Sequence, residues 1–208
     1  MMISVNGLRK AFKKQVVLDG IDLRIPAGSI YALLGPNGAG KTTTIQILST
    51  LMRPDGGEVR IKGHDLQREP DAIRALIGVT GQFSAVDPIL TGEENLMLMA
   101  DLRHLERAEG RRRTVDLLHR FDLNDAGKKQ ASSYSGGMRR KLDLAMALIG
   151  NPQLIFLDEP TTGLDPRSRQ MLWETIRMMA DGGITILLTT QYLDEADRLA
   201  DRVGVLDK

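Results

Sequence analysis

Short apolar runs recur along the chain and are separated by amphipathic segments. Residues 29–34, 154–157 and 184–189 are apolar or β-branched runs with the length of a buried strand, and 202–206 reads as a last, shorter one. Helical spacing of apolar residues fills most of the intervals between them. Strands that alternate with helices predict an α/β fold with a mainly parallel sheet at its core.

Three helices are predicted around these strands. Residues 42–52 carry apolar side chains at helical spacing, and the pattern stops at the turn cluster that begins with Pro54. A second helix has Asp165 as N-cap, Pro166 in its first turn and a glycine pair at 182–183 beyond its end. A third precedes the last strand, at 193–200. The apolar face of the first helix is expected to hold Ile45, Leu48, Leu51 and Met52.

The N-terminal part of the chain has a different pattern of apolar and polar residues. In residues 3–25, β-branched residues alternate with polar ones, which predicts two or three antiparallel strands. Residues 58–61 and 76–80 read as further strands. We therefore expect an N-terminal antiparallel β subdomain beside the parallel core.

Residues 91–150 are dominated by helical patterns. Thr91 and Glu94 have capping-box spacing, in which each side chain satisfies a free backbone donor of the other. Further helices are predicted at 111–121 and 136–149. The expected organisation is a single domain, 1–208, whose core comprises 1–82 and 151–208 and whose inserted helical lobe comprises 83–150. In the first helix of this lobe, apolar residues recur at three-residue spacing: Leu96, Met99, Leu102 and Leu105.

Composition narrows the classes of function. The 208 residues are 42% hydrophobic and 26% charged, which is usual for a globular protein. The 28 basic and 27 acidic residues give a net charge of +1, so no nucleic-acid partner is expected. Without cysteine, neither disulfides nor cysteine metal sites can form. Residues 1–10 lack the apolar core of a signal peptide, and no apolar run reaches the ~20 residues of a spanning helix. A membrane role is expected to require a partner.

A glycine-rich motif follows the strand at 29–34. Its glycines let backbone N–H groups turn toward an anion, and the start of the next helix adds a positive end. Lys41 would contact the β- and γ-phosphates of ATP, Thr42 would bind Mg²⁺, and Thr43 would add one more hydroxyl contact. A chance turn is the alternative, against which the flanking strand and helix argue. The motif fits G-x-x-x-x-G-K-[ST] and consists of Gly35, Pro36, Asn37, Gly38, Ala39, Gly40, Lys41 and Thr42.

Two carboxylates, Asp158 and Glu159, end the apolar strand at 154–157. Consecutive strand residues face opposite ways, so the two are expected to have different roles. We assign Asp158 to Mg²⁺, through water, because Mg²⁺ keeps much of its hydration shell. We assign Glu159 as the general base that polarises the attacking water. A solvated acidic turn is the alternative, and the phosphate loop upstream favours the catalytic interpretation.

With these motifs in this order, the chain resembles the ATP-binding subunits of ABC transporters over nearly its whole length. Ser135, Gly136 and Gly137 match the family's signature motif, which contacts the γ-phosphate of nucleotide held by the opposite subunit. Small residues at a helix N-terminus can form a backbone anion site, which is consistent with a contact to the γ-phosphate. The resemblance implies ATP and Mg²⁺ as cofactors and a homodimer or pseudo-dimer that forms through ATP.

The resemblance also assigns roles outside these motifs. Gln82 resembles the Q-loop glutamine, which senses Mg²⁺ and water and faces the membrane partner; an ordinary loop amide is the alternative. Residues 163–165 resemble the D-loop that communicates across the dimer, and Asp165 fits a helix N-cap as well. Phe12 lies where the family places an aromatic ring against adenine, and a core aromatic at a strand end explains it equally well.

The chain departs from the family pattern in two places. Tyr134 and Met138 flank the signature where leucine and glutamine are usual, and Gln191 replaces the switch histidine. Both departures are similar to the daunorubicin-resistance branch of drug exporters, whose partner is a separate ABC-2 type membrane protein. An amide can donate to the γ-phosphate but cannot carry charge or shuttle a proton, so Glu159 is expected to carry more of the catalysis. The histidines present, expected at the surface, are His64, His104 and His119.

The resemblance implies the ATP-hydrolysing motor subunit of an exporter, held at the cytoplasmic face of the membrane by a separate permease. A soluble ABC protein that acts on ribosomes or DNA is the alternative. Such proteins typically carry two cassettes or a long coiled-coil insertion, whereas this sequence has one phosphate loop and a short helical lobe. A small-molecule kinase would leave the motif at Ser135 unexplained. Because family members usually continue further, we expect more chain after Lys208.

Overall fold

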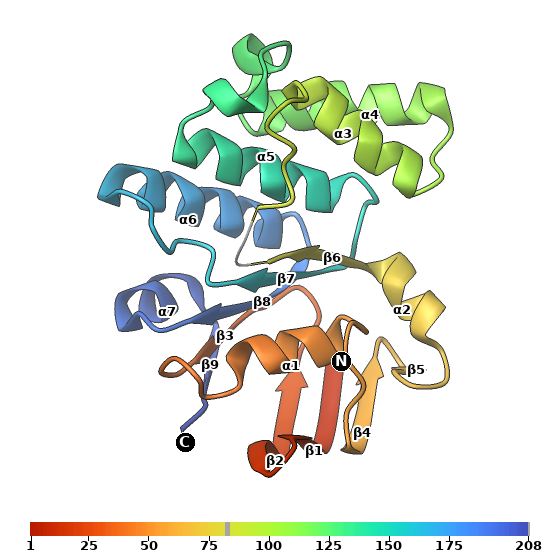
Figure 1. The fold of residues 1–208 in the computed structure, drawn as a ribbon, viewed down its shortest axis with the longest axis vertical. Helices are drawn as coiled ribbons and strands as arrows, with labels where there is room; N and C mark the ends of the chain where they lie inside the picture. Colours follow the sequence, from red (N-terminus) through yellow and green to blue (C-terminus); the bar gives the residue numbers. More distant parts are fainter. Residues whose placement is uncertain (82–83, 208) are drawn as a thin grey trace.

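A five-stranded parallel sheet lies at the centre of the structure, a computed structural model that describes residues 1–81 and 84–207 (Figure 1). The strand order is β6-β7-β8-β3-β9, and every neighbouring pair is parallel. The predicted α/β fold with a parallel core is confirmed. The strands are β3 (Ile30–Leu34), β6 (Ile77–Thr80), β7 (Leu154–Asp158), β8 (Thr185–Thr190) and β9 (Arg202–Val205).

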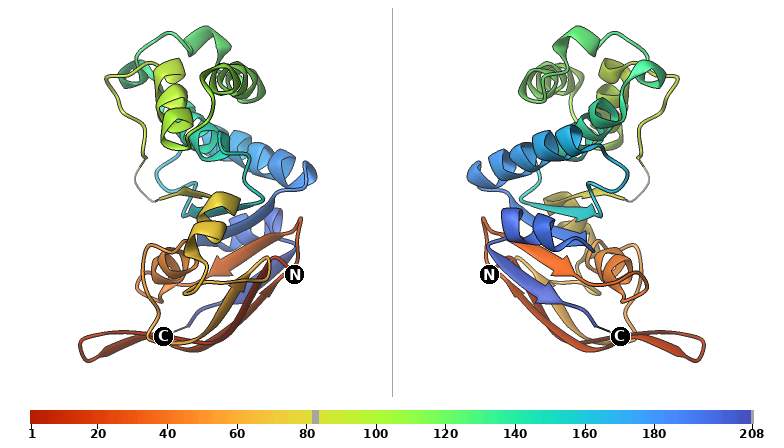
Figure 2. Two further views of the ribbon diagram at one scale, coloured as in Figure 1. Left: turned by 90° about the vertical axis from the view of Figure 1, so that its right-hand side faces the viewer. Right: turned by 90° about the vertical axis from the view of Figure 1, so that its left-hand side faces the viewer.

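A second sheet, antiparallel and of order β2-β1-β4-β5, is formed from the N-terminal part of the chain. Residues 3–25 form two strands of it, joined by a tight hairpin that extends away from α3 and α4 (Figure 2). The expected antiparallel subdomain is therefore present. Its strands are β1 (Ile3–Phe12), β2 (Gln15–Ile25), β4 (Gly56–Ile61) and β5 (His64–Asp65).

Seven α-helices are described, and α3, α4 and α5 gather at one end of the molecule (Figure 1). The capping box is confirmed, because Glu94 N donates to Thr91 Oγ1 at 3.1 Å and Thr91 N donates to Glu94 Oε2 at 2.8 Å. Within the described part of the chain, no helix combines the length and apolar character needed to cross a bilayer. The helices are α1 (Lys41–Leu48), α2 (Pro70–Leu76), α3 (Gly92–Leu102), α4 (Arg107–Arg120), α5 (Gly136–Leu148), α6 (Pro166–Asp181) and α7 (Leu193–Leu199).

Apolar side chains bury both faces of the parallel sheet. On β7, Ile155 and Leu157 belong to a core shared with α5 and α6, whereas Leu154 and Phe156 belong to a core shared with α1 and the antiparallel sheet. A parallel sheet covered on both faces needs nearly continuous apolar strands, which explains why these runs do not alternate with polar residues. Both cores include side chains of the sheet, so the packing of the sheet fixes the positions of the polar residues at the ends of its strands.

Three details of the predicted helices are wrong. The first helix ends at Leu48, because Thr50 adopts a left-handed backbone with φ 66°, and Leu51 is 74% exposed. Leu102 is 63% exposed, since three-residue spacing turns each successive side chain further around a helix of 3.6 residues per turn. The helix α2 was not predicted. Only Ile73 is buried among its residues, so no apolar stripe recurs along it.

Candidate functional site

The glycine-rich segment forms the turn between β3 and α1. Its first residue, Gly35, donates its N–H to Thr190 O at 3.2 Å, which places the turn beside the end of β8. Gly40, at the N-cap of α1, has φ 96°. A Cβ at Gly40 would also lie 2.7 Å from Leu18 Cδ2 and 3.1 Å from Val17 O, so glycine is required by both backbone and packing.

Lys41 begins α1 and is only 4% exposed. Its Nζ donates to Gly35 O at 2.8 Å and to Pro36 O at 3.1 Å, so the ammonium lies under the turn. The same Nζ lies 3.2 Å from Glu159 Oε1. Thr42, beside it, is exposed and Thr43 is partly exposed. The structure therefore brings the loop cation and the predicted general base together from distant parts of the sequence.

Both residues line a pocket of about 430 Å³. Gln15 and Val17, from β2, also line it. They were not predicted from the sequence, because they lie in a hairpin strand without a recognisable motif. A second pocket of similar volume shares Gln15, Val17 and Gly38 and continues along β2. The first is lined by Gln15, Val17, Asn37, Gly38, Gly40, Lys41, Thr42, Thr43 and Glu159.

The two carboxylates are directed apart by the end of the strand. The strand β7 ends at Asp158, which is buried, and Glu159 follows it with a left-handed φ of 47°. Such a conformation costs a non-glycine residue about 1–3 kcal/mol. The turn, and not the alternation of a strand, gives Glu159 its direction toward the pocket. Thr162 Oγ1 donates to Glu159 Oε2 at 3.3 Å and adds a second contact to the carboxylate.

One hydroxyl on β8 contacts both acidic residues. Thr189 Oγ1 donates to Asp158 Oδ1 at 2.6 Å and accepts from Glu159 N at 3.0 Å. Asp158 and Thr189 are also register partners of the β7–β8 pair. Thr189 was not predicted from the sequence. The available signal was a polar residue at the end of an otherwise apolar strand.

Two of the predicted ligands carry donor atoms suited to Mg²⁺, and of these Thr42 lines the phosphate-loop pocket. Thr42 offers a hydroxyl and Asp158 a carboxylate, both hard oxygen ligands. No group of three or more His, Cys, Asp or Glu side chains able to hold a metal ion occurs within residues 1–81 and 84–207. An ion held by Thr42 and Asp158 would therefore take its remaining ligands from phosphate and water, which is how Mg²⁺ is usually bound with nucleotides.

The residues of the predicted signature lie at a different place. Ser135 is the N-cap of α5 and accepts from Met138 N at 3.2 Å. Gly137 packs against Ser168 of α6, since a Cβ there would be 2.9 Å from Ser168 Oγ. Ser135 and Gly137 line a small pocket of about 80 Å³ that, in the described structure, has no residue in common with the phosphate-loop pocket. Gly136, between them, is exposed.

Two further predicted positions, Phe12 and Gln191, do not line the phosphate-loop pocket as described. Phe12 is 45% exposed at the end of β1, with Lys10 Nζ 5.7 Å from its ring centroid. Gln191 is exposed and does not line the pocket; it directly follows Thr190, whose carbonyl oxygen accepts from Gly35 N. Gln82 lies outside the described residues.

A buried ion pair behind the acidic residues was also missed. Arg140, on α5, donates to Pro160 O at 3.0 Å, to Gly81 O at 3.1 Å and to Asp143 Oδ2 at 2.9 Å. Asp143 Oδ1 accepts from Ala85 N at 3.1 Å. Burial raises the pKa of Asp143, and the Arg140 guanidinium opposes that shift. The pair ties α5 to the turn after Glu159 and to both Gly81 and Ala85.

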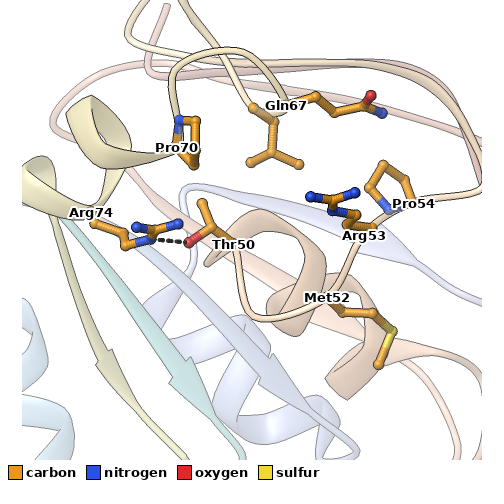
Figure 3. Close-up of a pocket in the computed structure, with 8 residues that line it drawn as sticks. Thr50, Met52, Arg53, Pro54, Gln67, Pro70 and Arg74 are labelled. Carbon is orange, nitrogen blue, oxygen red and sulfur yellow. Dashed lines mark hydrogen bonds between the residues drawn. The ribbon is translucent and has the colours of Figure 1, made fainter.

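A separate depression of about 230 Å³ lies between the turn after α1 and the helix α2 (Figure 3). Arg74 is directed at Thr50, with Nε donating to Thr50 Oγ1 at 3.0 Å. As described, none of the predicted site residues lines it. Its chemistry is therefore unconnected with the phosphate loop.

Comparison with known proteins decides the family. The sequence profile described as "ABC transporter" matches residues 18–162. The chain belongs to the ABC transporter family. This ABC chain is 54% identical, over 205 residues, to the daunorubicin/doxorubicin resistance ATP-binding protein of Streptomyces peucetius. It is 41% identical, over 206 residues, to the Nod factor export ATP-binding protein I of Ralstonia nicotianae. These alignments cover 99% of the ABC chain but only 62% and 64% of the two relatives, less than two thirds of their length.

Solved structures confirm the ABC fold. A structure described as the ATP-binding subunit of an ABC transporter is 33% identical, with a TM-score of 0.85, and the match covers 99% of this chain and 86% of that one. A dimeric ATP-binding cassette in a post-hydrolysis state, bound to ADP and Pi, is 25% identical, with a TM-score of 0.86 and coverage of 99% and 94%. The predicted family and fold are both confirmed.

Proposed function

We propose that this ABC chain binds MgATP in the phosphate-loop pocket and hydrolyses it. The observation that carries the proposal is the distance of 3.2 Å between Lys41 Nζ and Glu159 Oε1, at the wall of one pocket. It places a phosphate-binding cation beside a carboxylate that can accept a proton from water. The family match and the dimeric cassette solved with ADP and Pi support the same conclusion.

Each residue of the pocket has a role in this reaction. Lys41, Thr43 and backbone N–H groups in the loop from Gly35 to Thr42 would bind the β- and γ-phosphates and stabilise charge that grows on them. Glu159 orients the attacking water and accepts its proton. Thr42 and Asp158 would hold Mg²⁺, which when bound neutralises the phosphate oxygens. Gln191 follows β8 beside the loop and would donate its amide hydrogen to the γ-phosphate.

A complete site is proposed to need two copies of the chain. Ser135 and Gly137 line a pocket apart from Lys41, so a single chain carries two separate halves of the proposed site. ATP would join two copies, or this chain and a similar one, with each phosphate loop opposite the other copy's Ser135-Gly136-Gly137. Phe12 would pack against the adenine. Gln82 would contact Mg²⁺ and water and face the membrane partner.

We further propose that the chain is the motor subunit of a drug exporter. The two relatives named above are a resistance and an export ATP-binding protein, and neither name refers to ribosomes or DNA. A separate permease would hold the subunit at the cytoplasmic face of the membrane. The core, residues 1–82 and 151–208, would bind ATP, and the helical lobe, residues 83–150, would transmit the motion of the two copies to that permease.

Phosphate release by the purified chain tests the enzymatic part. With ATP and Mg²⁺ we expect turnover by the wild type and a loss of at least about 100-fold in Lys41→Met, because the buried ammonium cannot be replaced by an apolar side chain. Lys62→Met is the matched control, since Lys62 is exposed and bonds Gln153 away from the pocket. Equal turnover by the wild type and Lys41→Met would refute the assignment.

The exporter part needs a different measurement. The full-length protein should co-purify with a membrane protein, and ATP turnover should rise when that permease is present with its transported compound. Co-purification with ribosomes instead, and no membrane protein, would favour the alternative function.

A further inference from the structure

Thr189 occupies an unusual position among the residues around the proposed site. It lies near the end of β8 and is fully buried, with 0% exposure. Its hydroxyl makes two bonds at once, donating to Asp158 Oδ1 at 2.6 Å and accepting from Glu159 N at 3.0 Å. A hydroxyl has one hydrogen to donate and lone pairs to accept, so the two bonds are compatible. One side chain thus contacts both members of the acidic pair.

The backbone at Glu159 depends on an acceptor of this kind. The β7–β8 ladder ends with the pair Asp158 and Thr189, so the next N–H along β7, that of Glu159, lies beyond the regular sheet bonds. Its φ of 47° turns the chain out of the strand at that point. A backbone N–H in such a place must be satisfied by a side chain or by water. Thr189 supplies that acceptor, whereas valine, with nearly the same shape, could not.

We propose that Thr189 is a positioning residue for hydrolysis. Its hydroxyl fixes the Asp158 carboxylate on the Mg²⁺ side and, by the same atom, holds the turn that aims Glu159 at the pocket. Thr189 also lies two residues before Gln191, whose amide is proposed to contact the γ-phosphate. It therefore connects the acidic pair to the end of β8 that carries Gln191. This inference rests on the proposed function, since it names what aligns the residues of that reaction.

Three variants separate positioning from simple stability. Thr189→Val removes the hydroxyl with little change of shape, and Thr189→Ser keeps the hydroxyl. Thr185→Val is the matched control. Thr185 lies on the same strand with 0% exposure, and its hydroxyl accepts from Gly28 N at 2.9 Å at the opposite end of β8. Both valine variants therefore lose a buried hydroxyl that satisfies a backbone N–H, and only one of them is next to the carboxylates.

Steady-state kinetics is the first measurement. In Thr189→Val we expect kcat to fall about 10- to 100-fold, the range expected when a reacting group is displaced by a fraction of an ångström to an ångström, with KM for ATP within about threefold of wild type. Thr189→Ser should recover kcat to within about threefold. Thr185→Val should lower the melting temperature to a similar extent as Thr189→Val and leave kcat unchanged. Equal kcat values in the two valine variants would overturn the inference.

A binding measurement serves as the second readout and does not depend on turnover. The affinity for ATP is measured with Mg²⁺ and again with EDTA. The affinity with Mg²⁺ divided by the affinity with EDTA should fall several-fold in Thr189→Val, because Asp158 loses its orientation. In Thr185→Val this ratio should stay at the wild-type value. If the wild type binds MgATP without hydrolysing it, the proposed hydrolysis fails while this ratio still decides the role of Thr189. An unchanged ratio in Thr189→Val would overturn the positioning of Asp158, and a wild type without nucleotide binding would overturn both proposals.

Discussion

The Nζ atom of Lys41 lies 3.2 Å from Oε1 of Glu159, and the two side chains are only 4% and 10% exposed. The ammonium has three N–H donors, and it also donates to the carbonyl oxygens of Gly35 and Pro36. A phosphate oxygen that binds Lys41 must therefore compete with one of these partners. Displacement of Glu159 would release its carboxylate toward a water molecule, so phosphate binding and activation of the base are linked through one cation.

Glu159→Gln should retain ATP binding and lose most of its turnover. The amide has nearly the same size but cannot accept a proton, and removal of a general base lowers kcat by about 10²–10⁴-fold. Gln191→Ala should have a smaller effect, because it removes one hydrogen-bond donor and no proton acceptor. Steady-state ATPase assays with both variants measure the difference. The catalytic assignment would be wrong if Gln191→Ala abolished turnover and Glu159→Gln preserved it.

Gly40→Ala should weaken both stability and ATP binding. The left-handed backbone costs alanine about 1–2 kcal/mol, and the new Cβ would press on Val17 and Leu18 beside the pocket. Gly28→Ala is the control, since Gly28 has φ 72° but no atom within 4 Å of the added Cβ. Urea unfolding should show a loss in both variants, larger for Gly40→Ala. In nucleotide titrations Kd should rise at least about tenfold only for Gly40→Ala, and a Kd equal to wild type would contradict the packing argument.

Ser135 allows the role of a helix cap to be separated from a role toward phosphate. Ser135→Ala loses the N-cap bond to Met138 N and should destabilise the chain by about 1 kcal/mol. Ser135→Asp keeps a good N-cap and should restore stability, yet its negative charge would face a phosphate held by the other copy. Size-exclusion chromatography with ATP, in a Glu159→Gln background, should show no dimer for the aspartate variant. An ATP-dependent dimer of Ser135→Asp would contradict the composite site.

Acid stability should depend on Glu109. Hydrogen bonds from Arg112 and Arg113 lower its pKa to about 2, from an ordinary value of 4.5. A carboxyl whose folded pKa is depressed stabilises the fold fully above its unfolded pKa and loses that contribution as pH falls through the folded value. The difference in urea midpoint between wild type and Glu109→Gln should be constant above about pH 5 and shrink steadily toward pH 2. A difference in urea midpoint that stays constant down to pH 2 would contradict this role of Glu109.

The local elements were largely predictable, because each carried a physical signal in consecutive residues. The capping box at Thr91 and the N-cap at Asp165 were both present in the structure, with Asp165 Oδ1 accepting from Ser168 N at 3.0 Å. The parallel sheet followed from apolar runs between helices. The phosphate loop was likewise predictable, because a predicted strand precedes it and a predicted helix follows it. The apolar pattern did not show where α1 ends, because the left-handed backbone at Thr50 leaves Leu51 exposed.

Contacts between distant segments were not predictable in the same way. Gln15 and Val17 line the pocket because a hairpin packs against the loop, and their sequence carries no motif. Arg140 is one of several basic residues in the segment that begins α5, and only the fold reveals that it is buried among Pro160, Gly81 and Asp143. Single-sequence patterns record local geometry, whereas these roles depend on which surfaces meet.

The order of the parallel sheet has a consequence for the tolerance of the site to change. The strands β7, β8 and β3 are neighbours, and their carboxyl ends carry Asp158, Gln191 and Gly35 in that order. Adjacent strands are about 4.8 Å apart, a spacing that the backbone ladder fixes independently of side chains. Replacements in the apolar cores beneath can therefore weaken the fold before they alter the separation of the reacting groups. Mutations that accumulate in the interior of the protein should therefore shorten the time that it stays folded more readily than they change its catalytic activity.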